Sequence, residues 1–220
     1  MIFLSYVLNQ NTPTYGDRNR FDIIKKTAIS KGDIANDSFI STTVHIGTHI
    51  DMPYHFYDNG QTIEDFDPKF WIFNNPLIVE IKPENLIIKD DLIIKLSRIK
   101  DIDFDILIVK TGICNIRDEK KFWSENYGFH PDIYDFLIDR FPKVRVLGFD
   151  SISVSSFSDR LLGREAHKRF LNPEKPLLLI EDMDLRTIDE KSTFDKIIVA
   201  PLRIAGCDGL PCTVMGLKDD

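Results

Sequence analysis

The chain alternates between short apolar runs and segments rich in turn-forming residues, a pattern that predicts a mixed fold. In the first half, residues 39–46 alternate in polarity, with Ile40 and Val44 on one face, which is typical of a strand with one covered side. Residues 9–20 are dense in turn formers and predict a loop, and Asp58-Asn59-Gly60 predicts a turn. The strands predicted in this half are 2–8, 39–46, 77–81 and 106–109.

The second half has longer periodic segments. Pro131 opens a predicted helix whose apolar face includes Ile133 and Leu137, and Pro142 closes it. A second helix is predicted from a cap at Ser158 or Asp159 to about Phe170. The strands predicted here are 144–149, 177–180 and 197–200. Because strands and helices alternate from 104 to 181, we expect an α/β fold with a mixed, partly barrel-like β-sheet and flanking helices.

Length and composition limit the class of protein. A chain of 220 residues with 43% hydrophobic and 29% charged residues predicts one folded domain, residues 1–220. The formal net charge of −7 lacks the basic excess of a nucleic-acid binder, so no nucleic-acid partner is expected. No apolar run is long enough for a membrane span, and the N-terminus lacks the basic region of a signal peptide. The three cysteines show no C-x-x-C spacing, which favours reduced thiols and a cytoplasmic location.

Three of the five histidines fall within eleven residues, in the segment from His45 to His55. His45, His49 and Asp51 together are a ligand set used by divalent metals. On a straight strand, residues four apart are separated by about 13 Å, too far to share one ion. The chain must therefore bend between His45 and His49, and Gly47 is the residue that tolerates a bend. The alternative is a set of surface histidines or hydrogen-bonded core histidines.

Two downstream residues add to this hypothesis. His167 lies on the predicted second helix, where a helix-surface position is the alternative. Glu181 directly follows a buried apolar run, and a carboxylate there needs a compensating charge, from a cation, an arginine or solvent. His130, at the start of the first helix, is interpreted as structural.

Several motifs together resemble a known family. The segment His45-x-Gly-Thr-His49-x-Asp51-x-Pro53-x-His55-Phe is similar to the signature of metal-dependent cyclase-like hydrolases, which include bacterial kynurenine formamidases (arylformamidases) and isatin hydrolases. The resemblance continues in further segments and spans most of the chain, from about residue 1 to 217. These segments are Gly148–Val154, Gly163–Leu171, Leu179–Leu185 and Pro201–Pro211.

The resemblance implies a swivelling β/β/α-like fold and roles for individual residues. His45, His49 and Asp51 would hold a first metal, and Asp51 would also reach a second one, held by His167 and Glu181. His55 would be the general acid/base. The implied cofactor is Zn²⁺, alternatively Mn²⁺, with one or two ions per subunit, and the implied assembly is a homodimer.

The implied activity is hydrolysis of a formamide or cyclic amide C–N bond by metal-bound hydroxide, with His55 passing the proton to the leaving nitrogen. The alternative is a metal-binding or small-ligand-binding protein without turnover. Tyr15 is a candidate wall for a substrate ring, or it packs the loop. Formamidases tend to show Thr-Pro-x-Trp/Tyr-Pro-Gly-Asp here, and this chain reads Thr12-Pro-Thr-Tyr-Gly-Asp17, one proline short. It also has Ser155-Ser156 where formamidases often carry Asp-Pro, so the substrate among amides stays open.

Overall fold

The computed structural model describes residues 1–100 and 103–218. One mixed sheet dominates it, with eight strands in the order β5-β12-β13-β4-β11-β10-β8-β6 and β1 added alongside β13. The bounds of these strands are β1 Ile2–Phe3, β4 His49–Asp51, β5 Ile72–Phe73, β6 Pro76–Glu80, β8 Ile106–Lys110, β10 Val146–Phe149, β11 Leu178–Glu181, β12 Lys196–Pro201 and β13 Gly209–Leu217.

The sheet is half antiparallel and half parallel. The pairs from β5 through β11 are antiparallel, and those from β11 through β6 are parallel. The parallel strands β8, β10 and β11 are continuous buried apolar runs, as expected for strands covered on both faces. These are the strands that the alternation between 104 and 181 predicts, so the predicted α/β layer is confirmed.

The two edges of the sheet are adjacent in the chain. Edge strand β5 ends at Phe73 and the opposite edge strand β6 begins at Pro76, so only Asn74 and Asn75 connect them. The carboxylate of Asp105 accepts hydrogen bonds from both of these backbone N–H groups. A sheet whose edges are two residues apart must curl back on itself, which gives the barrel-like form predicted from the sequence.

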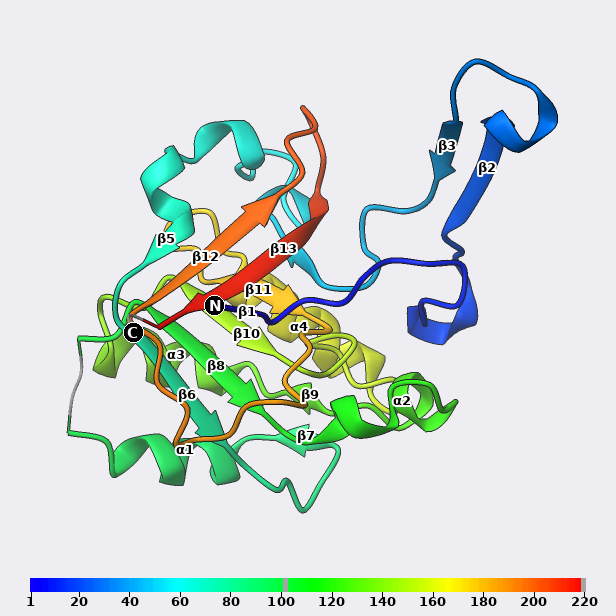
Figure 1. The fold of residues 1–220 in the computed structure, drawn as a ribbon. Coiled ribbons are helices and arrows are strands. Elements are labelled where there is room, and N and C mark those ends of the chain that lie inside the picture. Colours follow the sequence, from blue (N-terminus) through cyan, green and yellow to red (C-terminus); the bar gives the residue numbers. More distant parts are fainter. Residues whose placement is uncertain (101–102, 219–220) are drawn as a thin grey trace.

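Helices pack around this sheet (Figure 1). The predicted helices are confirmed: Asp159 caps α4 by accepting from the Leu162 N–H, and Pro131 is the residue before α3. The helix α1 was not predicted. The helices and the small strand pair β7–β9 have the bounds α1 Asp90–Ser97, α2 Lys121–Ser124, α3 Asp132–Arg140, α4 Arg160–Phe170, β7 Ile87–Ile88 and β9 Gly128–Phe129. Among the described residues, no helix combines the length and apolar character needed to cross a bilayer.

A two-stranded ribbon of β2 (Asp22–Thr27) and β3 (Asp37–Ser41) stands out from the body, and we call it the arm (Figure 1). The prediction of one strand over 39–46 with a covered face is wrong in two respects. The strand ends at Ser41, and all five of its residues are exposed. The physical reason is that, within the described part of the chain, β3 pairs with β2 alone and all residues of both strands are exposed.

The N-terminal run is also shorter as a strand than predicted, with β1 at Ile2–Phe3 and a single bridge from Ser5 to Met183. The turn predicted at Asp58-Asn59-Gly60 is confirmed, since the Gly60 N–H donates to the Tyr57 carbonyl.

Candidate metal centre

The histidine segment bends as the donor geometry requires. Gly47 has a φ of 57°, the left-handed conformation that glycine adopts at little cost, and it separates His45 from strand β4. His49 and Asp51 are two apart on β4, so their side chains point to the same face of the sheet. Pro53 then begins a short 3-10 helix that ends at His55. The bend predicted at Gly47 is therefore confirmed.

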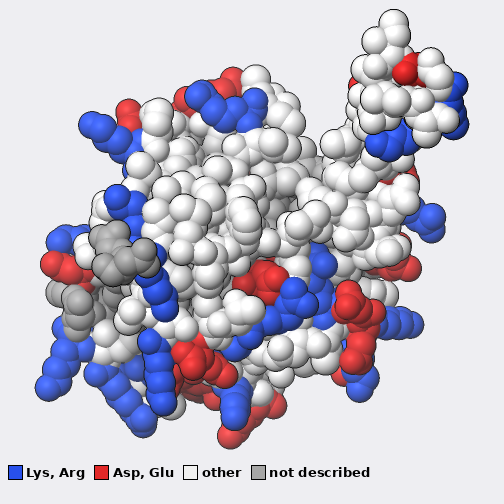
Figure 2. All heavy atoms as spheres, in the orientation of Figure 1, with Lys and Arg blue, Asp and Glu red and all other residues white. Residues whose placement is uncertain are grey.

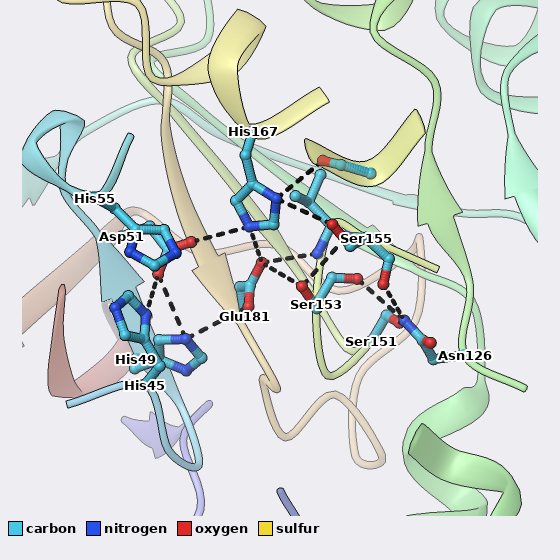
Figure 3. A network of polar contacts seen from close by, with 12 residues as sticks. His45, His49, Asp51, His55, Asn126, Ser151, Ser153, Ser155, His167 and Glu181 are labelled. Carbon is cyan, nitrogen blue, oxygen red and sulfur yellow. Dashed lines mark hydrogen bonds and ion pairs between the residues drawn. The ribbon is translucent and has the colours of Figure 1, made fainter. Parts of the chain in front are cut away.

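Strand pairing brings the downstream residues to the same place. In the antiparallel pair of β4 and β11, Glu181 lies directly opposite His49. His167 on α4 is buried and points at this cluster instead of outward, so the helix-surface alternative is wrong (Figure 3). The Glu181 carboxylate accepts a hydrogen bond of 2.7 Å from the Val154 N–H. It has no arginine partner among the described residues.

Backbone carbonyls fix the ring orientation of two of the histidines. The Nδ1 of His49 lies 2.8 Å from the Gly47 carbonyl oxygen, and the Nδ1 of His167 lies 3.0 Å from that of Gly163. A carbonyl only accepts, so in both rings Nδ1 carries a proton, and Nε2 is the atom that faces the cluster and can bind an ion in place of a proton. The Ser155 hydroxyl also lies 3.0 Å from the His167 Nδ1. This is the arrangement that holds metal-binding histidines in proteins.

The donor atoms at the centre are spaced for an ion and not for hydrogen bonds to one another. The His49 Nε2 lies 3.4 Å from an oxygen of Asp51 and 3.4 Å from one of Glu181, and the His167 Nε2 lies 3.5 Å and 3.7 Å from oxygens of the same two carboxylates. Two donors each about 2.1 Å from a tetrahedral ion are about 3.4 Å apart. The Nε2 of His49 and the Oδ2 of Asp51 are buried without a hydrogen-bond partner among the described residues. A divalent ion fits these orphaned atoms.

Electrostatics favour a cation at the same point. Burial opposes charge on His49 and His167, yet the carboxylates of Asp51 and Glu181 outweigh it and raise the pKa of both rings. Burial likewise opposes ionisation of Asp51, but His45 and the neighbouring imidazoles hold its pKa well below the usual value. Two buried carboxylates therefore present negative charge that positive charge must balance, and a dication supplies it.

His45 and His55 lie nearer to solvent and share a carboxylate that the sequence did not indicate. The Nδ1 of His45 lies 2.9 Å from Asp51 and its Nε2 lies 2.8 Å from Asp208, while the Nδ1 of His55 lies 2.8 Å from the same oxygen of Asp208. Although burial opposes it, the charge of Asp51 and the bond to Asp208 raise the pKa of His45 to about 9. His45, Asp51 and His55 form one group of close donors, and His49, Asp51 and Glu181 form another.

A cavity of about 320 Å³ opens onto this centre. The six predicted site residues in the cluster all line it, and so does Tyr15. The Tyr15 ring also packs edge-on against Phe157. Tyr15 therefore both forms part of the cavity wall and packs against a neighbouring aromatic ring. Two arginines of α4, Arg160 and Arg164, line the cavity as well and were not singled out from the sequence, although they share a helical face with His167.

Comparison with known proteins places the chain in a family. A family model described as "Putative cyclase" matches residues 2–156. The chain belongs to the Cyclase family. It is 24% identical to Cyclase-like protein 2 of Arabidopsis thaliana over 84% of this chain, and it spans 66% of that protein's length, just under two thirds. It is also 24% identical to the kynurenine formamidase of Bacillus cereus, covering 96% of this chain and 93% of that protein.

Solved structures show the same fold. Isatin hydrolase A from Labrenzia aggregata superposes with a TM-score of 0.76 at 17% identity, over 99% of this chain and 93% of that one. A second isatin hydrolase, bound to the product analogue thioisatinate, gives a TM-score of 0.77 at 17% identity, over 99% and 92% of the two chains. The fold predicted from the motifs is thereby confirmed.

Proposed function

We propose that this protein is a metal-dependent hydrolase that cleaves the C–N bond of a formamide or a cyclic amide. The observation that carries the proposal is the pair of buried atoms without partners, the His49 Nε2 and the Asp51 Oδ2, at ion-like spacing from Glu181 and His167. The names of the relatives, a kynurenine formamidase and isatin hydrolases, support amides as the substrate class.

The residues divide between two adjoining positions. His49 and Asp51 would hold a first ion with Glu181 in reach, and His45 would join them by exchanging its contact with Asp51 for the ion. His167 would hold a second ion together with Asp51 and Glu181. Mixed imidazole and carboxylate donors suit Zn²⁺, alternatively Mn²⁺. A bound divalent ion would supply Lewis acidity, lowering the pKa of water and polarising the substrate carbonyl.

His55 is the residue proposed to move the proton. It lines the cavity, and Asp208 holds its Nδ1, which leaves Nε2 as the atom that exchanges a proton with substrate. His55 would take a proton from the attacking water as the water oxygen bonds to the carbonyl carbon. The C–N bond would then break, and the nitrogen would depart with the proton that His55 returns. A positioned acid/base of this kind contributes about 10²–10⁴ in rate.

The test is hydrolysis by metal-reconstituted protein of N-formylkynurenine, formanilide, isatin and simple lactams, each with a chelator control. We expect turnover of at least one amide that the chelator abolishes. The variant His55→Ala should keep its metal and lose about 10²–10⁴ of the rate. His130→Ala, outside the cavity, is the control and should match the wild type. Metal binding without turnover on any amide would favour a ligand-binding protein instead.

A homodimer is part of the same proposal. The arm carries exposed apolar side chains, including Ile34, Phe39 and Ile40, and an isolated two-stranded ribbon is marginally stable in water. A broad uncharged area lies over β12 and β13 on the face shown in Figure 2, while the arm stands clear of the body. Light scattering should give twice the chain mass, and Phe39→Ser with Ile40→Ser should give the monomer. A monomeric wild type would contradict this assembly.

A further inference from the structure

The face of α4 that lines the cavity carries three functional side chains in a row. Arg160, Arg164 and His167 follow the i, i+4, i+7 spacing of one helical face, and all three line the cavity. His167 belongs to the metal centre, whereas the two arginines lie toward the helix start and the cavity mouth. The proposed hydrolysis gives these two arginines no role.

The two guanidinium groups are not paired with acidic residues. Neither Arg160 nor Arg164 forms an ion pair with any residue in the described ranges, 1–100 and 103–218. Farther along the same helix, Arg169 lies outside the cavity and pairs with Asp135. Both side chains are exposed at the cavity, so their charges are accessible to a ligand that enters it. In a chain whose acidic residues outnumber its basic ones by 35 to 28, two cavity-lining cations without acidic partners concentrate positive charge that attracts an anion.

Tyr15 lines the same cavity as this pair. Burial raises the pKa of the Tyr15 hydroxyl, and the positive charge of Arg160 is the largest influence in the opposite direction. The Tyr15 hydroxyl is buried without a hydrogen-bond partner among the described residues. A phenol that keeps its proton donates a hydrogen bond, so this wall of the cavity adds a neutral donor to two charged ones.

We infer that the substrate carries a carboxylate remote from its scissile amide, and that Arg160 and Arg164 bind it while the amide lies at the metal centre. This inference rests on the proposed function and narrows its substrate class to anionic amides. Guanidinium groups match a carboxylate through paired N–H donors, which suits them to this recognition.

The helix sets the length of such a substrate. With a rise of about 1.5 Å per residue, the Cα atom of Arg164 is about 4.5 Å from that of His167 along the helix axis, and the Cα atom of Arg160 is about 10 Å from it. The carboxylate should therefore lie about 5–10 Å from the carbonyl that is attacked, the span of one benzene ring with a substituent at each end. The cavity of about 320 Å³ is of a size for such a molecule.

The experiment compares 4-formamidobenzoate with its neutral methyl ester on the metal-loaded enzyme. We expect the double variant Arg160→Gln, Arg164→Gln to lose about 10–100-fold in kcat/KM on the acid, as loss of charged hydrogen bonds implies, and under threefold on the ester. The control is Arg169→Gln, which removes one positive charge from the same helix outside the cavity and should leave both rates unchanged.

A binding measurement without turnover separates this inference from the hydrolysis. Calorimetric titration of metal-stripped protein with 4-aminobenzoate should show binding that the double variant weakens at least tenfold, and methyl 4-aminobenzoate should bind both proteins equally. The anion site would be overturned if the double variant lost kcat/KM equally on the acid and the ester, or if it bound 4-aminobenzoate as tightly as the wild type does. In either case the proposed hydrolysis would be unaffected. If neither amide were hydrolysed but the acid bound through the arginines, the anion site would stand and hydrolysis of this amide class would fail.

Discussion

Replacing Gly209 by alanine tests how the first histidine of the cluster is held. Gly209 begins β13 opposite Asp51, and an added Cβ would lie 2.5 Å from the His45 Cε1 and 2.9 Å from its Nδ1. Non-bonded carbon atoms prefer about 3.5–4.0 Å, so the ring must move by about 1 Å. The His45 ring is fixed between two carboxylates, at 2.9 Å from Asp51 and 2.8 Å from Asp208. A shift of this size lengthens at least one of these contacts beyond hydrogen-bonding range.

The expected cost follows from those contacts. A hydrogen bond to a charged group contributes about 1.5–3 kcal/mol, and the partial exposure of Asp208 puts its bond at the low end. We therefore expect the free energy of unfolding to fall by about 2–3 kcal/mol, or the melting temperature by about 5–10 °C for a chain of this length. Zinc affinity should fall about 10–100-fold, as for other losses of ligand support.

The assay is zinc competition with a chromophoric chelator, together with thermal melting. Gly206→Ala is the matched control, because no atom lies within 4 Å of its added Cβ and its φ of 69° leaves backbone strain as the only penalty. The control should lose about 1–2 kcal/mol and keep its zinc affinity. Wild-type zinc affinity in Gly209→Ala would refute the reasoning that the fixed His45 ring supports the centre.

Three further outcomes are expected. Zinc at a hundred times its Kd should stabilise the stripped protein by about 2.7 kcal/mol, a rise of about 5–10 °C that EDTA reverses, and an unchanged melting curve would argue against the centre. Asp208→Asn should lower kcat about 10–100-fold when zinc is saturating, since Asp208 orients His55, and a wild-type kcat at saturating zinc would contradict that role. At pH 8 a thiol reagent should modify Cys207 alone, because burial raises the pKa of Cys114 to about 12 and also raises that of Cys212; rapid reaction of a second thiol would contradict this. The pKa of the Cys114 thiol is higher in the folded protein than in the unfolded chain. Burial of this neutral thiol therefore contributes fully to stability below about pH 8, and that contribution is lost as the pH rises towards 12. Urea titrations at several pH values would show this loss.

The sequence predicted the parallel half of the fold better than the antiparallel half. Strands β8, β10 and β11 are uninterrupted apolar runs, a signal that does not depend on their partners. Strand β13 was not predicted because Gly209, Pro211 and Gly216 punctuate it, and its pairing with β4 and β12 overrides that local preference. The arm was mispredicted for the opposite reason, since its alternation has no sheet to face.

The site divides in a similar way. The bend at Gly47 followed from donor geometry alone, and the resemblance supplied His167 and Glu181, which the structure brings to the same centre. Asp208 lies within the matching segment Pro201–Pro211 but was given no role, because its contact with His45 depends on the strand register that the sequence does not show. The spacing of Arg160, Arg164 and His167 on one helical face can be seen in the sequence, but only the structure shows that this face lines the cavity.

The metal centre can form only when three antiparallel strands are paired in the correct register. Strand β4 lies between β11 and β13, with His49 opposite Glu181 and Asp51 opposite Gly209. A slip of one residue in either ladder would turn every facing side chain to the other side of the sheet. These strands come from distant parts of the chain, so the donors converge only after the longest loops have closed. Zinc should therefore bind late during refolding, and the rate of zinc binding would report when these strands have paired.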